Sequence, residues 1–355
     1  MHYFEYLDGY RGLLALIVAC AHTIHYSAKS ELVNFLNTIS QSVGVYGFFV
    51  LSSFLLTYRL LKQLKQFKQN SILNYFIRRF FHVYVPFFIY ATLAKFGPRI
   101  IGGHINYHEH LFYSSWTSLV SLNTDGSSHL WTIAPEIKYY FIIPIICLIC
   151  LKLGNKKILF VTAAGLWLAL DEKFNFFGLG SSDLDIKKRH VLLTRYAVFL
   201  YGSMAAVVLD IIEDSKAIVD FLKKNQVQFL INYSSLFVSL IGVRYKNHHL
   251  ISEFYTSGKI WSSVILLVAL SNEENFLKKF FCCSLLKNCG KYSFGIYILH
   301  PIFIQTTQYY AEFEMQLDFT VLVLFQSYLA AVLFNKYIEL NCIKLGNKFK
   351  HFFKI

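Results

Sequence analysis

The stretch LDGYRGLLALIVACAH, Leu7–His22, places an arginine before an apolar run and a histidine within that run. Arg11 and His22 are eleven residues apart. At a rise of about 1.5 Å per residue this is about 16 Å, roughly half of a hydrocarbon core about 30 Å thick. Asp8 and Arg11 are three residues apart, as are His22 and His25, so each pair shares a helix face. The run predicts a membrane-spanning helix with ionisable groups at its mouth and near its midpoint.

The composition of the whole chain is that of an integral, multi-pass membrane protein. Of its 355 residues, 55% are hydrophobic and 18% aromatic, and only 15% are charged. A soluble domain carries about 25% charged residues. The net charge of +13 comes from Lys and Arg in the short segments between apolar runs. The positive-inside rule accounts for that distribution, and no basic domain is separable from the spans, so we expect no nucleic acid as a partner.

The apolar runs predict an all-α fold, a polytopic transmembrane helical bundle of about ten spans, each needing about 20 residues. It forms a single membrane-embedded domain over 1–355. The expected spans are 9–27, 40–61, 79–97, 132–153, 156–172, 191–212, 227–243, 257–272, 292–310 and 318–338.

The cations between the spans predict the orientation of the bundle. The segment between the second and third spans and the C-terminal tail are both rich in Lys and Arg, which places both termini in the cytoplasm. The cations are Arg59, Lys62, Lys65, Lys68, Arg78 and Arg79 in the segment, and Lys344, Lys348, Lys350 and Lys354 in the tail. One loop, with Lys187, Lys188 and Arg189, opposes this assignment. Whether the host is a plasma membrane or an endomembrane stays open.

Ionisable residues within the other spans indicate a site in the bundle. They are Glu136, Arg195 and His300. A single histidine in a bundle is most often a packing residue. Several such groups on separate spans can pair with one another, and they usually mark a pathway or a reaction site.

These stretches resemble, in order, the motifs of the acyltransferase-3 family of membrane acyltransferases. The first run resembles the family's Arg-x10-His signature, and the match extends from Leu7 to Glu339. The further stretches are GVYGFFVLSSFLL, YFIRRFFHVYVPFF, HLWTIAPEIKYYF, RYAVFLYGSMAA, GKYSFGIYILHP and FNKYIE. The chain departs from the family pattern at Tyr46, Ser53, His82 and Leu340.

The resemblance implies transfer of an acyl group, typically acetyl, from cytoplasmic acyl-CoA to a hydroxyl of a carbohydrate or lipid acceptor across the membrane. His22 would be the general base and Glu136 its orienting partner or a ligand for the acceptor. Acyl-CoA, as donor substrate, carries phosphates that guanidinium groups bind bidentately. The expected donor-binding residues are Arg11, Arg78 and Arg79, and the expected substrate-pocket residues are His25, Trp131, Tyr297 and His300.

Other interpretations of the same residues stay open. A multi-pass transporter or permease would use the buried His, Arg and Glu groups as a proton or substrate path, but no internal repeat is seen. A catalytically silent family member would keep the motifs without turnover. An acyl-histidine intermediate is an alternative to general-base chemistry. The loop histidines His104, His108 and His110 lack a supporting ligand set, and we expect no metal.

Overall fold

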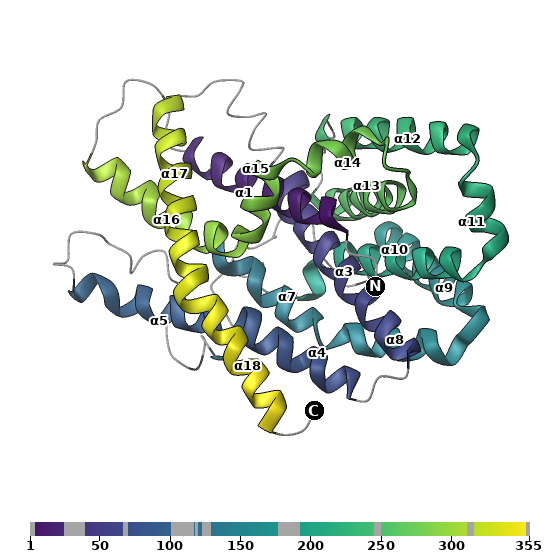
Figure 1. Ribbon diagram of the computed structural model, residues 1–355, viewed down its shortest axis with the longest axis horizontal. Coiled ribbons are helices and arrows are strands. Elements are labelled where there is room, and N and C mark those ends of the chain that lie inside the picture. The colour runs from purple at the N-terminus through teal and green to yellow at the C-terminus, as the bar shows by residue number, and fades with distance from the viewer. Residues whose placement is uncertain are drawn as a thin grey trace.

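The computed structural model describes residues 4–24, 40–66, 70–100, 117, 120–122, 129–176, 192–244, 250–310 and 316–352. Every regular element among these residues is a helix, as Figure 1 shows. The helices are α1 (Glu5–Ile24), α3 (Tyr46–Lys65), α4 (Ser71–Arg79), α5 (Val85–Ile100), α7 (Ile133–Tyr139), α8 (Ile142–Leu153), α9 (Ile158–Phe174), α10 (Tyr196–Asp214), α11 (Lys216–Leu222), α12 (Asn225–Arg244), α13 (Leu250–Leu270), α14 (Phe276–Phe281), α15 (Ser284–Lys291), α16 (Ser293–Tyr310), α17 (Gln316–Phe334) and α18 (Leu340–Phe352).

Short turns of 3-10 helix, which is wound more tightly than an α-helix, or of π-helix, which is wound more widely, interrupt or precede several of these helices. The π-helical turns are η1 (Ser40–Val45), η2 (Phe80–Tyr84) and η8 (Asn335–Glu339), and the 3-10 turns are η4 (His129–Thr132), η5 (Gly154–Lys156) and η7 (Leu192–Thr194). A π-helical turn inserts an extra residue into the helical ladder, and such turns occur frequently at functional sites.

The all-α class and the membrane character are confirmed. Within the described residues, which leave out 25–27 of the first span and 191 of the sixth, each expected span overlaps at least one helix. Within the described residues, five helical segments are long and apolar enough to cross a membrane, and Phe254–Leu270 is a shorter apolar helix. The five segments are Val43–Lys65, His129–Lys156, Tyr196–Asp214, Asn225–Val243 and Asp318–Phe352. The number of spans and the cytoplasmic location of the termini stay predictions.

Helix α3 is the central helix of the bundle and packs against α8, α10 and α13 (Figure 1). Its side chains Val50, Phe54 and Leu61 are fully buried. The crossing with α10 is close because a glycine meets a serine there: a Cβ on Gly202 would lie 2.1 Å from Ser53 Oγ. Small residues let two apolar helices approach when lipid, rather than water, surrounds them. Ser53, a departure from the family pattern, is therefore accommodated by the glycine opposite.

Helix α1 is fixed by backbone contact with the α14–α15 segment. A Cβ on Gly12 would lie 2.1 Å from the Leu286 carbonyl oxygen, and a Cβ on Gly290 would lie 1.8 Å from that of Asp8. No residue with a side chain fits at either position without displacing the neighbouring backbone. The rotation of α1 about its axis is therefore set by this contact, and with it the directions of Arg11 and His22.

A cluster of ion pairs joins α3, α9 and α10 at one end of the bundle. Asp210, whose side chain is fully buried, accepts from Lys62, Lys65 and Lys157 at 3.0, 2.7 and 2.5 Å. Lys65 and Lys157 also pair with Asp214, at 2.6 and 2.7 Å. The sequence predicts these lysines only as charges of the cytoplasmic side; in the structure they neutralise a buried carboxylate.

We expect Asp210→Asn to lower the free energy of unfolding by about 3 kcal/mol, because removing one partner of a buried ion pair leaves the others uncompensated. Thermal unfolding of the detergent-solubilised protein measures this. Asp214→Asn is the control, because the Asp214 side chain is 49% exposed and Asp210 remains in place. An equal loss of unfolding free energy in the two variants would contradict the central position given to Asp210.

Candidate active site

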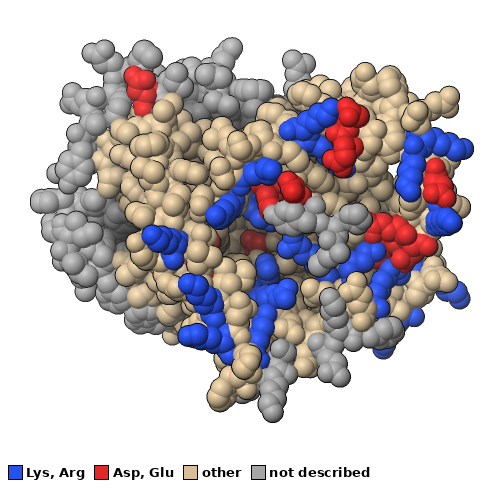
Figure 2. All heavy atoms as spheres, in the orientation of Figure 1, with Lys and Arg blue, Asp and Glu red and all other residues tan. Residues whose placement is uncertain are grey.

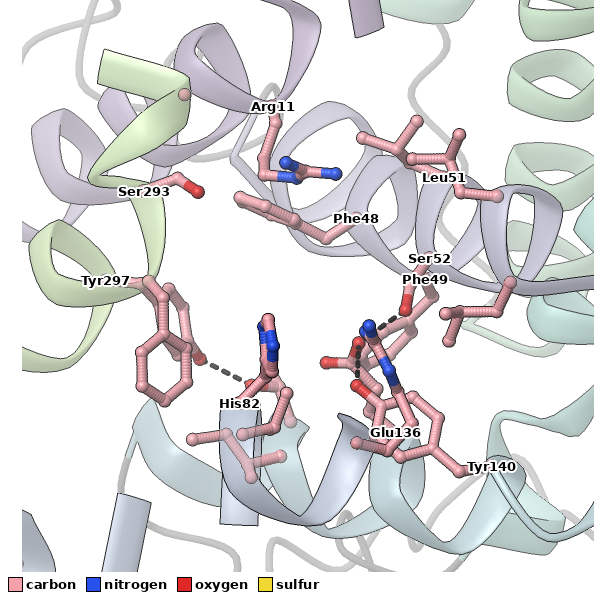
Figure 3. A pocket seen from close by; sticks show the side chains of 18 of the residues that line it. Arg11, Phe48, Phe49, Leu51, Ser52, His82, Glu136, Tyr140, Ser293 and Tyr297 are labelled. Atoms are coloured by element: carbon pink, nitrogen blue, oxygen red, sulfur yellow. Dashed lines mark hydrogen bonds between the residues drawn. The ribbon is translucent and has the colours of Figure 1, made fainter. Parts of the chain in front are cut away.

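A cavity of about 360 Å³ lies between α1, α3, α7, α16 and the turns η2 and η8. In Figure 3, Arg11 and Phe48 face His82 and Glu136 across it. Its wall is formed by Arg11, Val45, Phe48, Phe49, Leu51, Ser52, Leu55, Leu56, Arg59, Arg79, His82, Val83, Thr132, Ile133, Glu136, Tyr140, Gly290, Lys291, Ser293, Phe294, Tyr297 and Glu339.

Cations dominate the charged part of this wall. Arg11, Arg59, Arg79 and Lys291 line the cavity, and Lys and Arg side chains surround the hollow near the centre of Figure 2. Arg11 donates to Asp8 at 3.1 Å, the pairing expected from their spacing. A hollow with several guanidinium groups is suited to a ligand that carries more than one phosphate.

Two carboxylates face the same cavity. Ser52 Oγ and Tyr140 OH both donate to Glu136 Oε1, at 2.5 and 2.8 Å. These bonds fix the Glu136 carboxylate and leave its other oxygen able to accept from a molecule in the cavity. Glu339 accepts from Asn335 Nδ2 at 3.0 Å through Oε2.

Two buried polar atoms of the wall have no hydrogen-bond partner in the described part of the chain. They are Arg79 Nε and Glu339 Oε1. An unsatisfied buried polar group is costly, so native structures rarely contain one without a reason. A polar ligand in the cavity would satisfy both atoms.

His22 pairs with His300 across 278 residues of sequence. His22 Nδ1 lies 2.7 Å from His300 Nε2, and the ring planes differ by 10°. His300 is fully buried, and its Nδ1 lies 3.2 Å from the Ile296 carbonyl oxygen one turn earlier. The histidine on the first span is thus held by one near the end of the chain.

The Ile296 carbonyl determines the tautomers of this pair. A carbonyl oxygen only accepts, so His300 Nδ1 carries the proton. With both rings neutral, His300 Nε2 accepts from His22 Nδ1–H, and the lone pair of the His22 ring is on Nε2. An orienting hydrogen bond at one ring nitrogen commonly defines the chemistry of the other.

Tyr297 lines the cavity, and its ring centroid lies 6.1 Å from that of His300. Its hydroxyl donates to the carbonyl oxygen of His129 and lies 2.6 Å from Thr132 Oγ1. The His129 ring centroid lies 5.4 Å from that of His300 and 5.7 Å from that of Tyr297. His129 therefore belongs to the same group as Tyr297 and His300, although it is not among the site residues expected from the sequence. The signal available was its place directly before the Leu-Trp motif.

The structure separates the sequence-predicted residues into groups. Arg11, Arg79, Glu136 and Tyr297 line the cavity, whereas His22 and His300 pair with each other outside its lining. Trp131 lies outside the lining and packs its ring 5.4 Å from the Arg195 guanidinium. Arg78 is exposed at the end of α4 and also lies outside the lining. His25 lies outside the described residues.

Four other cavity residues were given no cavity role from the sequence, although each lies in one of the family-like stretches. Ser52 and Tyr140 bond Glu136, and His82 and Glu339 come from π-helical turns. Each of the turns η1, η2 and η8 contributes wall residues, Val45, His82 and Glu339 among them. A π-helical turn changes which residues face a neighbour, and the apolar periodicity of these stretches does not reveal it.

No group of three or more His, Cys, Asp or Glu side chains within the described residues is arranged to hold a metal ion. The loop histidines His104, His108 and His110 lie outside those residues. The arrangement that is present, cations beside a fixed carboxylate and an oriented imidazole, suits transfer of a group from a polyanionic donor by acid–base chemistry.

Comparison with known proteins identifies the family of the chain. The peptidoglycan O-acetyltransferase OatA of Listeria monocytogenes serovar 1/2a is 25% identical over a match that covers 99% of this chain. The chain spans 58% of that relative's length. No solved structure matches. The family model described as an acyltransferase domain matches residues 4–336, so the expected enzyme class is confirmed and the chain belongs to the acyltransferase-3 family.

Proposed function

We propose that the protein transfers an acyl group, most simply acetyl, from cytoplasmic acyl-CoA to a hydroxyl of a carbohydrate or lipid acceptor across the membrane. The observation that carries this proposal is the placement of Arg11 and His22 on one helix. Eleven residues are about three turns of α-helix, so both side chains leave α1 in nearly the same direction. Arg11 lines the cation-rich cavity, and His22 is bonded to His300 deeper along α1.

The cation-rich cavity would hold the phosphates of the donor. Arg11 and Arg79, together with Arg59 and Lys291, provide positive charge on several sides of it. The unpartnered Arg79 Nε would donate to a phosphate oxygen. Arg78, also expected to bind the donor, is exposed and outside the wall, and we assign it no role in donor binding.

The histidine pair would carry the proton. His22 Nε2 takes the proton of the acceptor hydroxyl while the hydroxyl oxygen attacks the thioester carbonyl carbon. The carbon–sulfur bond then breaks, and the thiolate leaves with the proton from the His22 imidazolium. His300 holds the imidazole in the required tautomer and stabilises it when charged, as an orienting partner does for a general base.

Glu136 would act on a substrate rather than on His22. Its hydrogen bonds go to Ser52 and Tyr140, and it faces the cavity. This favours the second of the roles expected for it, the binding of an acceptor hydroxyl. Tyr297 would line the path between the cavity and His22, and Trp131 would act indirectly through its contact with Arg195.

The proposal of a carbohydrate acceptor rests on the name of the relative. That protein is named for O-acetylation of peptidoglycan, a carbohydrate polymer. A carbohydrate hydroxyl is therefore the first acceptor to test, with lipid hydroxyls second.

We expect His22→Ala to lower the turnover of acetyl-CoA at least about 100-fold, the usual contribution of a general base. Turnover of the purified protein is measured in liposomes with a panel of sugar and lipid acceptors. The control is acetyl-CoA binding to the same variant, which should persist because His22 lies outside the cavity wall. Full turnover in His22→Ala would remove the central residue of the mechanism.

For His300 we expect the size of the defect to depend on whether the new side chain accepts a hydrogen bond. His300→Phe should lower kcat about 10- to 100-fold, with KM for acetyl-CoA unchanged, because a misplaced catalytic group costs rate rather than binding. His300→Gln should recover part of the loss, since its amide oxygen can accept from His22 Nδ1. An equal loss of kcat in both variants would indicate that His300 contributes through packing alone.

Substitutions of the neighbouring arginines Arg78 and Arg79 of α4 should differ in their effect on KM for acetyl-CoA. Arg79→Gln should raise KM for acetyl-CoA about tenfold or more, because a charge-assisted hydrogen bond contributes about 1.5–3 kcal/mol. Arg78→Gln removes the same charge from the adjacent, exposed position and should leave KM close to the wild-type value. If both variants changed KM equally, a general positive potential rather than the cavity would bind the donor.

A further inference from the structure

A second hollow, which we call the aromatic groove, lies beside the active-site cavity and shares Arg79 and Tyr140 with it. Its volume is about 550 Å³, within the range of about 300–1,000 Å³ typical of ligand pockets. It is lined by Phe76, Ile77, Arg79, Phe80, Phe81, Tyr84, Val120, Leu122, Ile137, Tyr140, Phe141 and Phe349.

The groove has an apolar wall and a buried floor. Aromatic rings of its wall contact one another in pairs. The Phe76 and Phe141 centroids lie 5.3 Å apart, and those of Phe81 and Phe349 lie 5.9 Å apart. Leu122 and Ile137 at the floor are buried. A hollow lined mostly by apolar side chains offers few partners to an ordered water, so within a membrane a hydrocarbon chain would fill it.

The cations that we call the rim, Arg78 and Lys350, each adjoin in sequence a lining residue of this apolar space, Arg79 and Phe349. Lys350 follows the groove residue Phe349 and lies within electrostatic reach of Arg78 and Arg79. Arg78 is exposed beside them at the end of α4. Clusters of Lys and Arg at the membrane surface attract anionic lipids, and basic pockets between helices bind their phosphates.

We propose that the aromatic groove binds one anionic phospholipid of the surrounding bilayer, with an acyl chain along the aromatic wall and the phosphate at Arg78 and Lys350. The proposal does not depend on acyl transfer. A zwitterionic lipid would fill the apolar volume but would neutralise the rim only in part. A water-soluble phosphate would bind the rim and leave the apolar volume empty. Only a ligand with both parts uses all the features of the groove.

The test is the number of phospholipids retained by the full-length protein in native mass spectrometry. The protein is incubated with dioleoyl phosphatidylglycerol or dioleoyl phosphatidylcholine and then diluted into detergent. Val120→Trp fills the groove from an exposed position, where the side chain is 57% exposed. Val321→Trp is the matched control, because Val321 on α17 is 56% exposed and lies outside the groove.

We expect the wild-type protein to retain one phosphatidylglycerol under conditions that remove phosphatidylcholine. Val120→Trp should weaken its retention at least tenfold, and Val321→Trp should not. Arg78→Gln, an exposed change that leaves packing intact, should also weaken it at least tenfold while KM for acetyl-CoA stays unchanged. Glycerol phosphate, which has the charge without the chain, should not compete.

Several results would overturn the proposal. Equal retention of the two lipids would show that the rim charge is unused. Wild-type retention in Val120→Trp, or equal loss in Val321→Trp, would place the lipid elsewhere. Competition by glycerol phosphate would identify a phosphate site without a lipid. Each readout is lipid binding, so loss of the proposed acyl transfer would not be confused with any of them.

Discussion

An ionisable side chain inside an apolar bundle has to find its hydrogen-bond partners within the protein, because lipid offers none. This constraint determines how the polar groups of the chain are arranged. Asp210 is surrounded by lysines, Glu136 is held by two hydroxyls, and His22 is paired with His300. The incompletely satisfied atoms of the cavity wall, Arg79 Nε and Glu339 Oε1, mark where a ligand would complete the arrangement.

The mechanism depends on the rotation of α1. Backbone contact at Gly12 and Gly290 fixes that helix against α15. Arg11 is thereby turned into the cation-rich cavity, and His22, three turns further along, is turned toward α16. A donor whose phosphates lie at Arg11 would extend its acyl end along α1 to the histidine pair. The same glycine contact would therefore set both the proposed donor binding and the proposed chemistry.

The sequence predicted the parts of this arrangement that are local. Hydropathy predicted the helices, and the spacing of Asp8 and Arg11 predicted their ion pair. It could not predict which residues meet across different helices, because packing decides the rotation and register of each helix. Adjacent residues on a helix point about 100° apart, so sequence alone does not decide whether Arg78 or Arg79 faces the cavity. The pairing of His22 with His300, and the place of His129 beside them, follow only from the assembled bundle.

The aromatic groove and the active-site cavity share the wall formed by Arg79 and Tyr140. Arg79 is one of the four cations of the cavity, and Tyr140 donates to Glu136, so occupancy of the groove would bear on two residues of the proposed site.

The central claim is that the donor enters by the cation-rich cavity and that its acyl end reaches the histidine pair. An acyl-CoA analogue with a photoreactive diazirine at the acyl terminus tests this directly, with the cross-linked peptides identified by mass spectrometry. The account predicts labelling of α1 near His22 or of α16 near His300, suppressed by excess acetyl-CoA. Labelling confined to the cavity mouth near Arg11, or labelling that acetyl-CoA does not suppress, would contradict it.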